Sequence, residues 1–460
     1  MVPPPTSQKN FDLIVIGGGP SGLAAAFRAS LEGKKVCLIE KGPSCGGSVH
    51  THRSEGFLAE AGPNTLLLSD ASLDPLLEAA GLASQSISSR PEAKKRFIVR
   101  SGRPVPLPTS PLGLIRTPVL SARAKLRLFG DLILPRTPEL SSITPGTYFE
   151  KRFGREVVDY LLNPFIGGIY AGDPHGLTLR HAFPGLYKIA QSSRSLILGG
   201  LGAARQKKKT RQTTARRMVS FPEGLSTLTS TLASRILQHS GCSIQTEATI
   251  HSLAGDDSGW TTFLGHRSQL KAPQLILAVP AHAIPNLPFE SVAFPALSEA
   301  ASELRYPPVT SVSLGFPQSS LQAPLTGFGV LVPAIEKRSI LGVLYASSIF
   351  PNRAPSDHAL FTIFVGGRQP EKADLPDQEL ICTVCGELKD LLGINGPPVW
   401  SYIKRWPRAI PQYDQAYDGW IHAVEQIERF HPALKIIGQT RDGISLPCSL
   451  LSGWEAGTGW

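Results

Sequence analysis

The stretch DLIVIGGGPSGL, residues 12–23, decides the fold of this chain. Its first five residues are typical of a short buried strand, and LAAAFRASLEGK continues after the glycines as a helix. Gly17, Gly19 and Gly22 have the G-x-G-x-x-G spacing. In such a unit the first glycine allows a tight turn, the second lets the backbone approach a pyrophosphate, and the third lets helix and strand pack closely. The N–H groups at the helix N-terminus would then face the phosphates.

A second strand, KVCLIE, follows at once and ends at Glu40, 23 residues after Gly17. An acidic residue at this place can accept hydrogen bonds from the ribose hydroxyls of an adenine dinucleotide. A glycine-rich turn alone is weak evidence, but here strand, glycines, helix and acid are in register. The sequence therefore predicts a Rossmann-like site for FAD or NAD(P).

The residues after Glu40 favour FAD. A nicotinamide dehydrogenase would be expected to continue with further strand–helix units, whereas this chain continues with KGPSCGGSVHTHRSEGFLAEAGPNTLL. The adjacent Gly46 and Gly47 let the backbone pass close to a phosphate or a ribityl chain, and a simple turn does not need them. Ser48 and Gly62 follow in the same segment and are candidate contacts of the cofactor.

The C-terminal stretch ALKIIGQTRDGISLPCSLLSG adds a second candidate flavin contact. Gly438 ends an apolar strand, and Gly443 and Ile444 precede a helix-like run. Backbone amides at such a strand–helix junction can bind the pyrimidine or ribityl end of a flavin. Taken alone, the pattern also fits any strand–turn–helix.

Length and composition indicate a globular protein of two or three domains. The chain has 460 residues, of which 42% are hydrophobic and 18% charged. Lys and Arg number 46 against 36 Asp and Glu, so the net charge of +10 favours acidic partners: nucleic acid, an anionic membrane surface or a carboxylated substrate. No nucleic-acid-binding module is recognisable, so no nucleic-acid partner is expected.

The chain shows no signal for export or for crossing a membrane. MVPPPTSQKN lacks a charged start followed by an apolar run, and no run of about 18 or more apolar residues occurs. The six cysteines are scattered, as expected for reduced thiols in the cytoplasm. Cys382 and Cys385 form a C-x-x-C within DQELICTVCGELKDLL, which favours a packed helix over a metal or redox site.

Several segments carry a resemblance to a known family. DLIVIGGGPSGLAAAF, CGGSVHTH, FLAEAGPNT and IIGQTRDGISLPCSLLSG resemble the flavin amine oxidase superfamily. NPFIGGIYAGDP, FPEGLSTL, YPPVTSVSLGF, LYASSIFPNRAP and KRWPRAIPQY, in this order, resemble the oxygen-dependent protoporphyrinogen oxidases of haem and chlorophyll synthesis. The family often has Asn where this chain has Gln439, which leaves one flavin contact open.

The resemblance implies a mixed α/β (α+β) fold in three parts. These are a Rossmann-like FAD-binding domain from 8–85, 215–290 and 428–460, an inserted substrate-binding domain from 86–99 and 291–427, and a helical membrane-associated domain from 100–214. Residues 100–136 support the last assignment, because short apolar runs stand beside seven Arg or Lys and one Asp. An ordinary amphipathic helix with a solvated basic face is the alternative.

A second basic stretch, RQKKKTRQTTARR at 205–217, has seven basic residues and no acid. We interpret it as a solvated mobile loop, with a functional basic patch as the alternative.

The resemblance further implies a porphyrinogen substrate, whose conversion to porphyrin removes six electrons and six hydrogens. A two-electron flavin would act three times, each time passing its electrons to oxygen to form hydrogen peroxide. FAD is expected to be noncovalent, since no histidine or cysteine lies in a recognised attachment motif. No general base is assigned.

By the same resemblance, Arg96 pairs with a substrate propionate, for which a bidentate guanidinium is well suited. Phe350 packs on a pyrrole ring, and Leu314 and Leu331 are aliphatic partners of the macrocycle. Gly168 lines the cavity with backbone. The alternatives are an exposed surface role for Arg96 and core positions for the three apolar residues.

The sequence motifs also fit other functions. Coproporphyrinogen has four propionates and would require more cations, whereas a carotenoid desaturase would need a long apolar tunnel. An amine oxidase, or a flavoprotein that holds porphyrin without oxidising it, also fits the cofactor motifs. We expect a cytoplasmic protein attached peripherally to an anionic membrane, with homodimerisation left open.

Overall fold

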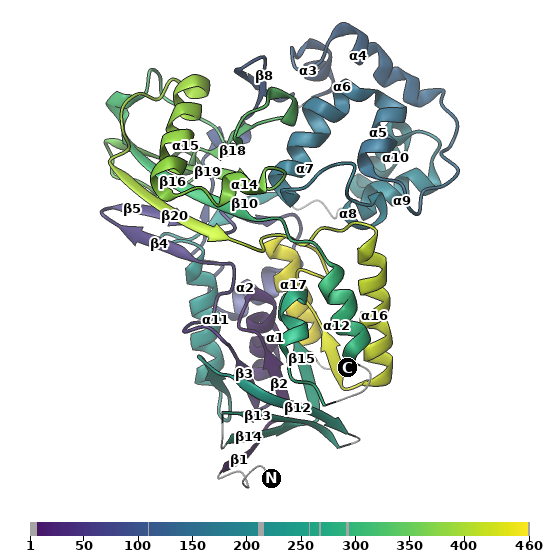
Figure 1. The fold of residues 1–460 in the computed structure, drawn as a ribbon, viewed down its shortest axis with the longest axis vertical. Helices are drawn as coiled ribbons and strands as arrows, with labels where there is room; N and C mark the ends of the chain where they lie inside the picture. Colours follow the sequence, from purple (N-terminus) through teal and green to yellow (C-terminus); the bar gives the residue numbers. More distant parts are fainter. Residues whose placement is uncertain are drawn as a thin grey trace.

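The computed structural model describes residues 7–108, 110–209, 216–256, 258–265, 268–290 and 294–458. In the view of Figure 1, a lower part built around a parallel sheet carries two upper lobes. One lobe consists mainly of a large β-sheet and the other of helices.

A five-stranded parallel sheet forms the centre of the lower part. Its strands, in spatial order, are β11 (Ser243–Gln245), β3 (Val36–Ile39), β2 (Leu13–Ile16), β15 (Gln274–Leu277) and β21 (Leu434–Ile436). Strands β2 and β3 are buried along their whole length, because helices cover both faces of the sheet. One face packs on α1 (Pro20–Leu31), α11 (Ser226–Gln238) and α17 (Leu446–Ala456). The other packs on α12 (Phe294–Glu303) and α16 (Ala416–Phe430).

Smaller sheets extend the lower part. A four-stranded sheet contains β1 (Ser7–Asn10), β14 (Ser268–Ala272), β13 (Gly259–Leu264) and β12 (Ile250–Asp256). A three-stranded sheet contains β6 (Leu66–Leu68), β10 (Arg217–Ser220) and β7 (Ile87–Ser88). Helix α2 (Asp74–Ala79) lies between β6 and β7 in sequence, and the hairpin of β4 (Thr51–Ser54) and β5 (Phe57–Glu60) precedes β6.

A seven-stranded sheet forms the second part. Its order is β20 (Trp400–Trp406), β16 (Val309–Pro317), β19 (His358–Gly366), β18 (Ile340–Leu344), β17 (Gly329–Leu331), β8 (Arg96–Arg100) and β9 (Arg103–Pro106). Two short helices, α13 (Ala346–Ile349) and α14 (Pro370–Ala373), flank β19 in sequence.

Helix α15 (Asp377–Leu392) covers one face of this sheet. Side chains alternate along a strand. On β16, Val312 and Leu314 therefore pack toward α15, while Val309 and Ser311 line a cavity on the opposite face. Of the two cysteines on α15, Cys382 is exposed and Cys385 packs against the core under the helix.

The third part is helical. Its elements are α3 (Pro111–Arg116), α4 (Ala122–Leu128), α5 (Pro145–Phe153), α6 (Arg155–Val157), a π-helical turn (Val158–Leu162), α7 (Asn163–Tyr170), α8 (Leu179–Ala182), α9 (Pro184–Ser192) and α10 (Leu196–Lys209). None of the described helices is long and apolar enough to cross a membrane.

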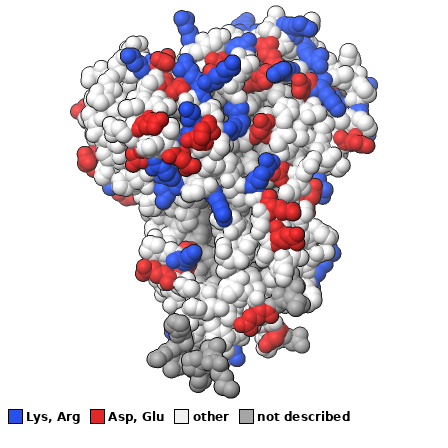
Figure 2. All heavy atoms as spheres, viewed as in Figure 1, with Lys and Arg blue, Asp and Glu red and all other residues white. Residues whose placement is uncertain are grey.

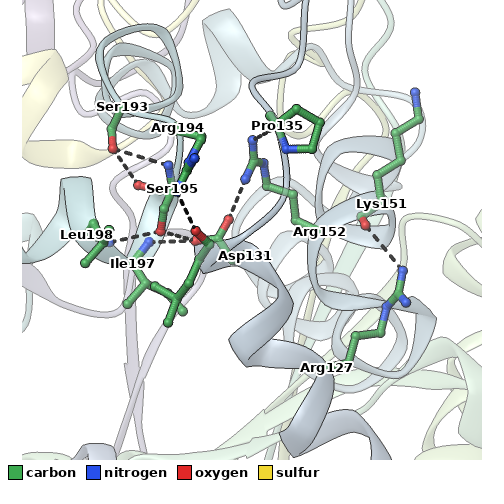
Figure 3. A network of polar contacts seen from close by, with 11 residues as sticks. Arg127, Asp131, Pro135, Lys151, Arg152, Ser193, Arg194, Ser195, Ile197 and Leu198 are labelled. Atoms are coloured by element: carbon green, nitrogen blue, oxygen red, sulfur yellow. Dashed lines mark hydrogen bonds and ion pairs between the residues drawn. The ribbon is translucent and has the colours of Figure 1, made fainter.

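A buried ion pair organises the helical part (Figure 3). Asp131 lies in a short 3₁₀ turn (Phe129–Leu132) and is fully buried, and its Oδ1 is 2.7 Å from Nη1 of Arg152 on α5. Its Oδ2 accepts hydrogen bonds from Ser195 Oγ (2.6 Å) and from the backbone N–H of Ile197 (3.0 Å) at the start of α10. One carboxylate thus connects α5, the turn and α10.

The observed elements differ from the predicted domain limits in two places. β9 pairs with β8 in the seven-stranded sheet, although the predicted helical segment begins at residue 100. Helices α12 and α16 pack on the parallel sheet, although they fall mostly within the predicted substrate segment 291–427. The apolar faces of both helices pack on the parallel sheet, and no local sequence motif indicates this packing. The mixed α/β architecture with a Rossmann-like sheet agrees with the prediction.

Candidate active site

A cavity of about 1040 Å³ connects the three parts of the molecule. It begins at the carboxyl ends of β2 and β15, where ligands bind in open parallel sheets, and continues to the seven-stranded sheet and α7. Its volume lies at the upper limit of ordinary ligand pockets, about 300–1,000 Å³, as expected of a site for large ligands.

The three glycines of the first turn have distinct surroundings. A Cβ on Gly17, whose φ is 107°, would lie 2.6 Å from the carbonyl oxygen of Ala278, and a Cβ on Gly22 would lie 1.9 Å from that of Gly17. A Cβ on Gly19 would have no described atom within 4 Å, and Gly19 lines the cavity. Gly19 is also the N-cap of α1 and has no side chain with which to cap the helix. A pyrophosphate fits here, because the first N–H groups of a helix have no partner within the helix and the backbone leaves space beside Gly19.

Glu40 is held at the cavity wall by two backbone hydrogen bonds. Its Oε2 accepts from the N–H of Gly18 and its Oε1 from the N–H of Gly42, each at 2.7 Å. A carboxylate has about four acceptor positions, so Glu40 keeps capacity for ribose hydroxyls.

The second glycine pair packs on the first turn. A Cβ on Gly47, with φ at 57°, would lie 3.0 Å from Cα of Gly19, and one on Gly62 would lie 2.0 Å from the carbonyl oxygen of Ser48. Gly47, Ser48 and Gly62 line the cavity. Gly46 lies behind them, and its N–H donates to the carbonyl of Gly18 at 2.8 Å. The pair therefore brings a second backbone segment alongside the glycine turn.

The loop after β21 forms the facing wall. Gly438 and Ile444 line the cavity together with Gln439 and Thr440. Gly443, with φ at 121°, does not line it; a Cβ there would lie 3.1 Å from the side chain of Cys448. Gly443 therefore shapes the turn that leads into α17.

Three aromatic residues hold this loop from behind, and sequence reasoning missed them. The hydroxyl of Tyr413 donates to the carbonyl of Gln439, the indole N–H of Trp420 to that of Thr440 (2.9 Å), and the hydroxyl of Tyr417 to that of Arg441 (3.2 Å). Burial raises the pKa of Tyr413 far above its ordinary value, so its hydroxyl stays protonated and donates. Tyr417 and Trp420, three residues apart, lie on one face of α16, and this spacing was the available signal for those two; Tyr413 precedes the helix.

Arg96 lies at the substrate end of the cavity. It is the first residue of β8, is exposed, and its guanidinium lies 4.8 Å from the ring centre of Phe328. In the described part of the chain no carboxylate pairs with it. Partial burial, followed by the charge of Arg216, lowers its pKa from the ordinary value.

Two of the four other predicted substrate contacts line the cavity. Gly168 on α7 and Leu331 on β17 both do, and a Cβ on Gly168 would lie 2.8 Å from Cδ2 of Leu331. Leu314 does not, because it is fully buried on the face of β16 that packs against α15. Phe350 is also buried and packs behind Phe328, which takes the wall position instead. For Leu314 and Phe350 the structure thus corrects the predicted contact to a core position.

Further wall residues carried no sequence signal. The apolar ones include Leu67, Phe97, Phe165, Ile169, Met218, Phe328, Leu341, Leu344 and Phe364. Polar additions are Arg408, which follows β20, and His282, whose pKa is lowered first by burial and then by Arg408. The substrate end is thus mostly apolar and aromatic.

Comparison with known proteins agrees with this site. The family model described as flavin containing amine oxidoreductase matches residues 20–455. The mitochondrial protoporphyrinogen oxidase of Nicotiana tabacum is 32% identical over 96% of this chain and 93% of its own length. The coproporphyrinogen III oxidase of Bacillus subtilis (strain 168) is 29% identical over 95% and 94%.

Solved structures show the same fold. A crystal structure of a protein from Exiguobacterium sp. 255-15 has a TM-score of 0.78 at 24% identity and covers 99% of this chain and 98% of that chain. Cyclohexylamine oxidase from Brevibacterium oxydans IH-35A has a TM-score of 0.69 at 17% identity, covering 98% of both chains. The chain therefore belongs to the flavin-containing amine oxidoreductase family, and its cofactor is FAD.

Proposed function

We propose that this protein oxidises protoporphyrinogen IX to protoporphyrin IX, with molecular oxygen as the electron acceptor and hydrogen peroxide as a product. The observation that carries the proposal is an apolar, aromatic chamber continuous with the FAD site, with Arg96 at its edge and no carboxylate paired with that arginine in the described part of the chain. Relatives named as protoporphyrinogen oxidases, 32% and 31% identical, support the same substrate.

The chamber suits a large, apolar macrocycle. The close approach of Gly168 to Leu331 leaves a smooth wall without polar side chains at that point. Arg96 is placed to hold a propionate at the edge while the carbon skeleton stays in the apolar part. When bound, FAD supplies the two-electron acceptor, so the six-electron conversion requires three rounds. The protein's part is to position the macrocycle and to exclude water.

The cations of the wall favour two propionates over four. Of the described lining residues, Lys41, Arg96 and Arg408 carry full positive charge. Lys41 adjoins Glu40 at the dinucleotide end, and Arg408 follows β20 at the edge of the seven-stranded sheet opposite to β8 and β9. A substrate with four propionates would need cations around the chamber, where the described residues of α7, β17 and β18 are apolar.

Coproporphyrinogen III is the second candidate, because the Bacillus subtilis relative is named for it. The test is oxygen uptake by the flavin-loaded protein with each porphyrinogen. We expect faster turnover of protoporphyrinogen IX and about three oxygen molecules consumed for each porphyrin formed, since each two-electron round uses one. A ratio near one would indicate a single desaturation. No oxygen uptake with either substrate would indicate a porphyrin-holding flavoprotein.

We also propose that FAD is held noncovalently, so that acid or heat releases it.

We propose further that the protein is cytoplasmic and attaches to an anionic membrane surface through the helical part. Large apolar side chains are exposed there, among them Ile115, Leu126, Phe129, Ile133, Leu198 and Leu201. Exposed apolar side chains beside basic ones are what an interfacial segment requires.

A further inference from the structure

The basic stretch 205–217 ends beside the cavity. Arg216 directly precedes β10, which pairs antiparallel with β6 so that Met218 lies opposite Leu67, and both residues line the cavity. Side chains alternate along a strand. Arg217 accordingly points away from the cavity and pairs with Asp74 at 3.2 Å. Arg216 stands two residues before Met218 and directly before the strand, so continued alternation places it on the side of Met218, although it is not among the described residues that line the cavity.

Arg96 and Arg216 form a pair of like charges at this end of the cavity. Arg216 lies near enough for its charge to lower the pKa of Arg96, and both side chains are exposed. In the described part of the chain neither has an acidic partner, whereas Arg217 and Arg100 each do, Asp74 and Glu156 respectively. Two uncompensated cations that are close enough to interact repel each other, and an anion that binds between them relieves the repulsion.

The proposed substrate has the matching chemistry. The two propionates of protoporphyrinogen IX stand on adjacent pyrroles and leave the macrocycle at the same edge. The walls next to Arg96 and Arg216 are apolar, with Phe328, Met218 and Leu67 in place to contact the rest of the ring. A molecule with two neighbouring carboxylates and an apolar body therefore fits this end of the cavity.

We propose that Arg216 is a second carboxylate anchor, which together with Arg96 binds the two neighbouring propionates of one porphyrinogen, one guanidinium to each. The proposal rests on the proposed function. It also assigns a binding role to the end of the basic stretch, for which the sequence alone favoured a solvated loop. Because the two arginines match the two propionates, they contribute to the choice of substrate.

The test compares Arg216→Ala with Arg217→Ala, a neighbouring arginine on the other face. Mesoporphyrin, a stable porphyrin with two propionates, and its dimethyl ester are titrated into the flavin-loaded proteins, with porphyrin fluorescence as the readout. We expect Arg216→Ala to weaken binding of the diacid about tenfold. This is the lower end of the loss expected for one charge-assisted hydrogen bond, because the side chain is exposed to solvent. Arg217→Ala should bind it like the wild type, and the diester should bind alike to all variants. Flavin content and thermal midpoint of each variant verify the fold.

The outcomes separate the two proposals. Tight diacid binding by both wild type and Arg216→Ala would overturn the second anchor alone. An equal loss in Arg217→Ala would also overturn it, because the effect would then reflect general surface charge. Failure of the wild type to bind the diacid, together with no oxygen uptake from porphyrinogen, would overturn the proposed function and the anchor with it. In the double variant Arg96→Ala/Arg216→Ala, the affinity for the diacid should fall to that for the diester.

Discussion

Gly19 and Gly22 differ in what a side chain would meet, and this difference gives a matched test of the cofactor site. The φ of Gly19 is −73° and no described atom lies within 4 Å of its Cβ position, so Gly19→Val should fold but occupy the space of the pyrophosphate. We expect it to purify without flavin, measured as the ratio of flavin to protein absorbance. Gly22→Ala should instead lower the yield of folded protein, because its Cβ would lie 1.9 Å from a carbonyl oxygen. Full flavin content in Gly19→Val would contradict the assignment.

Arg96 is the residue on which substrate affinity should depend most directly. Removing a charge-assisted hydrogen bond costs about 1.5–3 kcal/mol, or roughly 10- to 150-fold in affinity, and the exposure of Arg96 favours the lower end. We expect Arg96→Ala to raise KM for porphyrinogen with unchanged flavin content, and Arg96→Lys to restore binding only in part, since lysine lacks the planar fork. A porphyrinogen with esterified propionates should bind equally poorly to wild type and variant. Unchanged kinetics with the free acid would remove Arg96 from the site.

At the scale of elements, the segment that leads into α16 positions the loop after β21. In a trans peptide the carbonyl and the following N–H point in opposite directions. When Tyr413 holds the carbonyl of Gln439 from behind, the N–H of Thr440 is therefore directed toward the cavity, which Thr440 lines. Tyr413→Phe removes a hydrogen bond worth about 0.5–1.5 kcal/mol, so FAD should bind the apoprotein roughly 2- to 10-fold more weakly.

Tyr417→Phe is the matched control for this prediction. Its hydroxyl holds the carbonyl of Arg441, a residue that does not line the cavity, so FAD affinity should change less. Both affinities can be measured by flavin fluorescence during reconstitution. Equal losses in the two variants would indicate a general effect on the packing of α16 and would count against a specific role for Tyr413.

The helical part should depend on the buried network of Figure 3. Asp131→Ala leaves Arg152, which is 3% exposed, as a buried charge without its carboxylate, a change that costs about 3–5 kcal/mol. Arg155→Ala, which breaks the pair between the exposed Arg155 and the partly exposed Asp159, should cost about 0–1 kcal/mol. Denaturant unfolding measures both. A cost for Asp131→Ala as small as that for Arg155→Ala would show that the network contributes little to stability.

At the scale of the whole molecule, the helical part presents basic and large apolar side chains on its surface. Figure 2 shows Lys and Arg gathered along the upper right margin, where Figure 1 places the helical lobe. Leu126, Phe129 and Ile133 are 73%, 59% and 80% exposed within or just after α4, which also carries Arg123, Lys125 and Arg127. Apolar and basic side chains are thus presented together.

We therefore expect the protein to sediment with vesicles that contain anionic lipid, and less so as salt rises. The double variant Leu126→Glu/Ile133→Glu should lose at least about tenfold in vesicle affinity, because two apolar contacts are replaced by like-charged repulsion. Leu237→Glu, at an apolar position on α11 in the lower part that is 56% exposed, is the control and should bind like the wild type. If none of these proteins bound anionic vesicles, the membrane proposal would be wrong.

The sequence by itself determined the dinucleotide end of the cofactor site. Gly17, Gly19, Gly22 and Glu40 lie within one strand–helix–strand unit, where the short connections leave few arrangements and spacing alone brings glycines and acid to one place. The tertiary structure decided the substrate half. Leu314 lies in the core and Ser311 of the same strand lines the cavity, because α15 covers one face of the seven-stranded sheet and a strand's pattern does not say which face a distant helix will cover.

Arg216 is a second residue whose surroundings could not be predicted from the local sequence. The basic run 205–217 is read locally as a solvated segment, and only the pairing of β10 with β6, about 150 residues away in sequence, brings its last residues beside the cavity. Such long-range pairing depends on the free energy of the whole packed chain, to which many weak contacts contribute, so no short stretch of sequence specifies it.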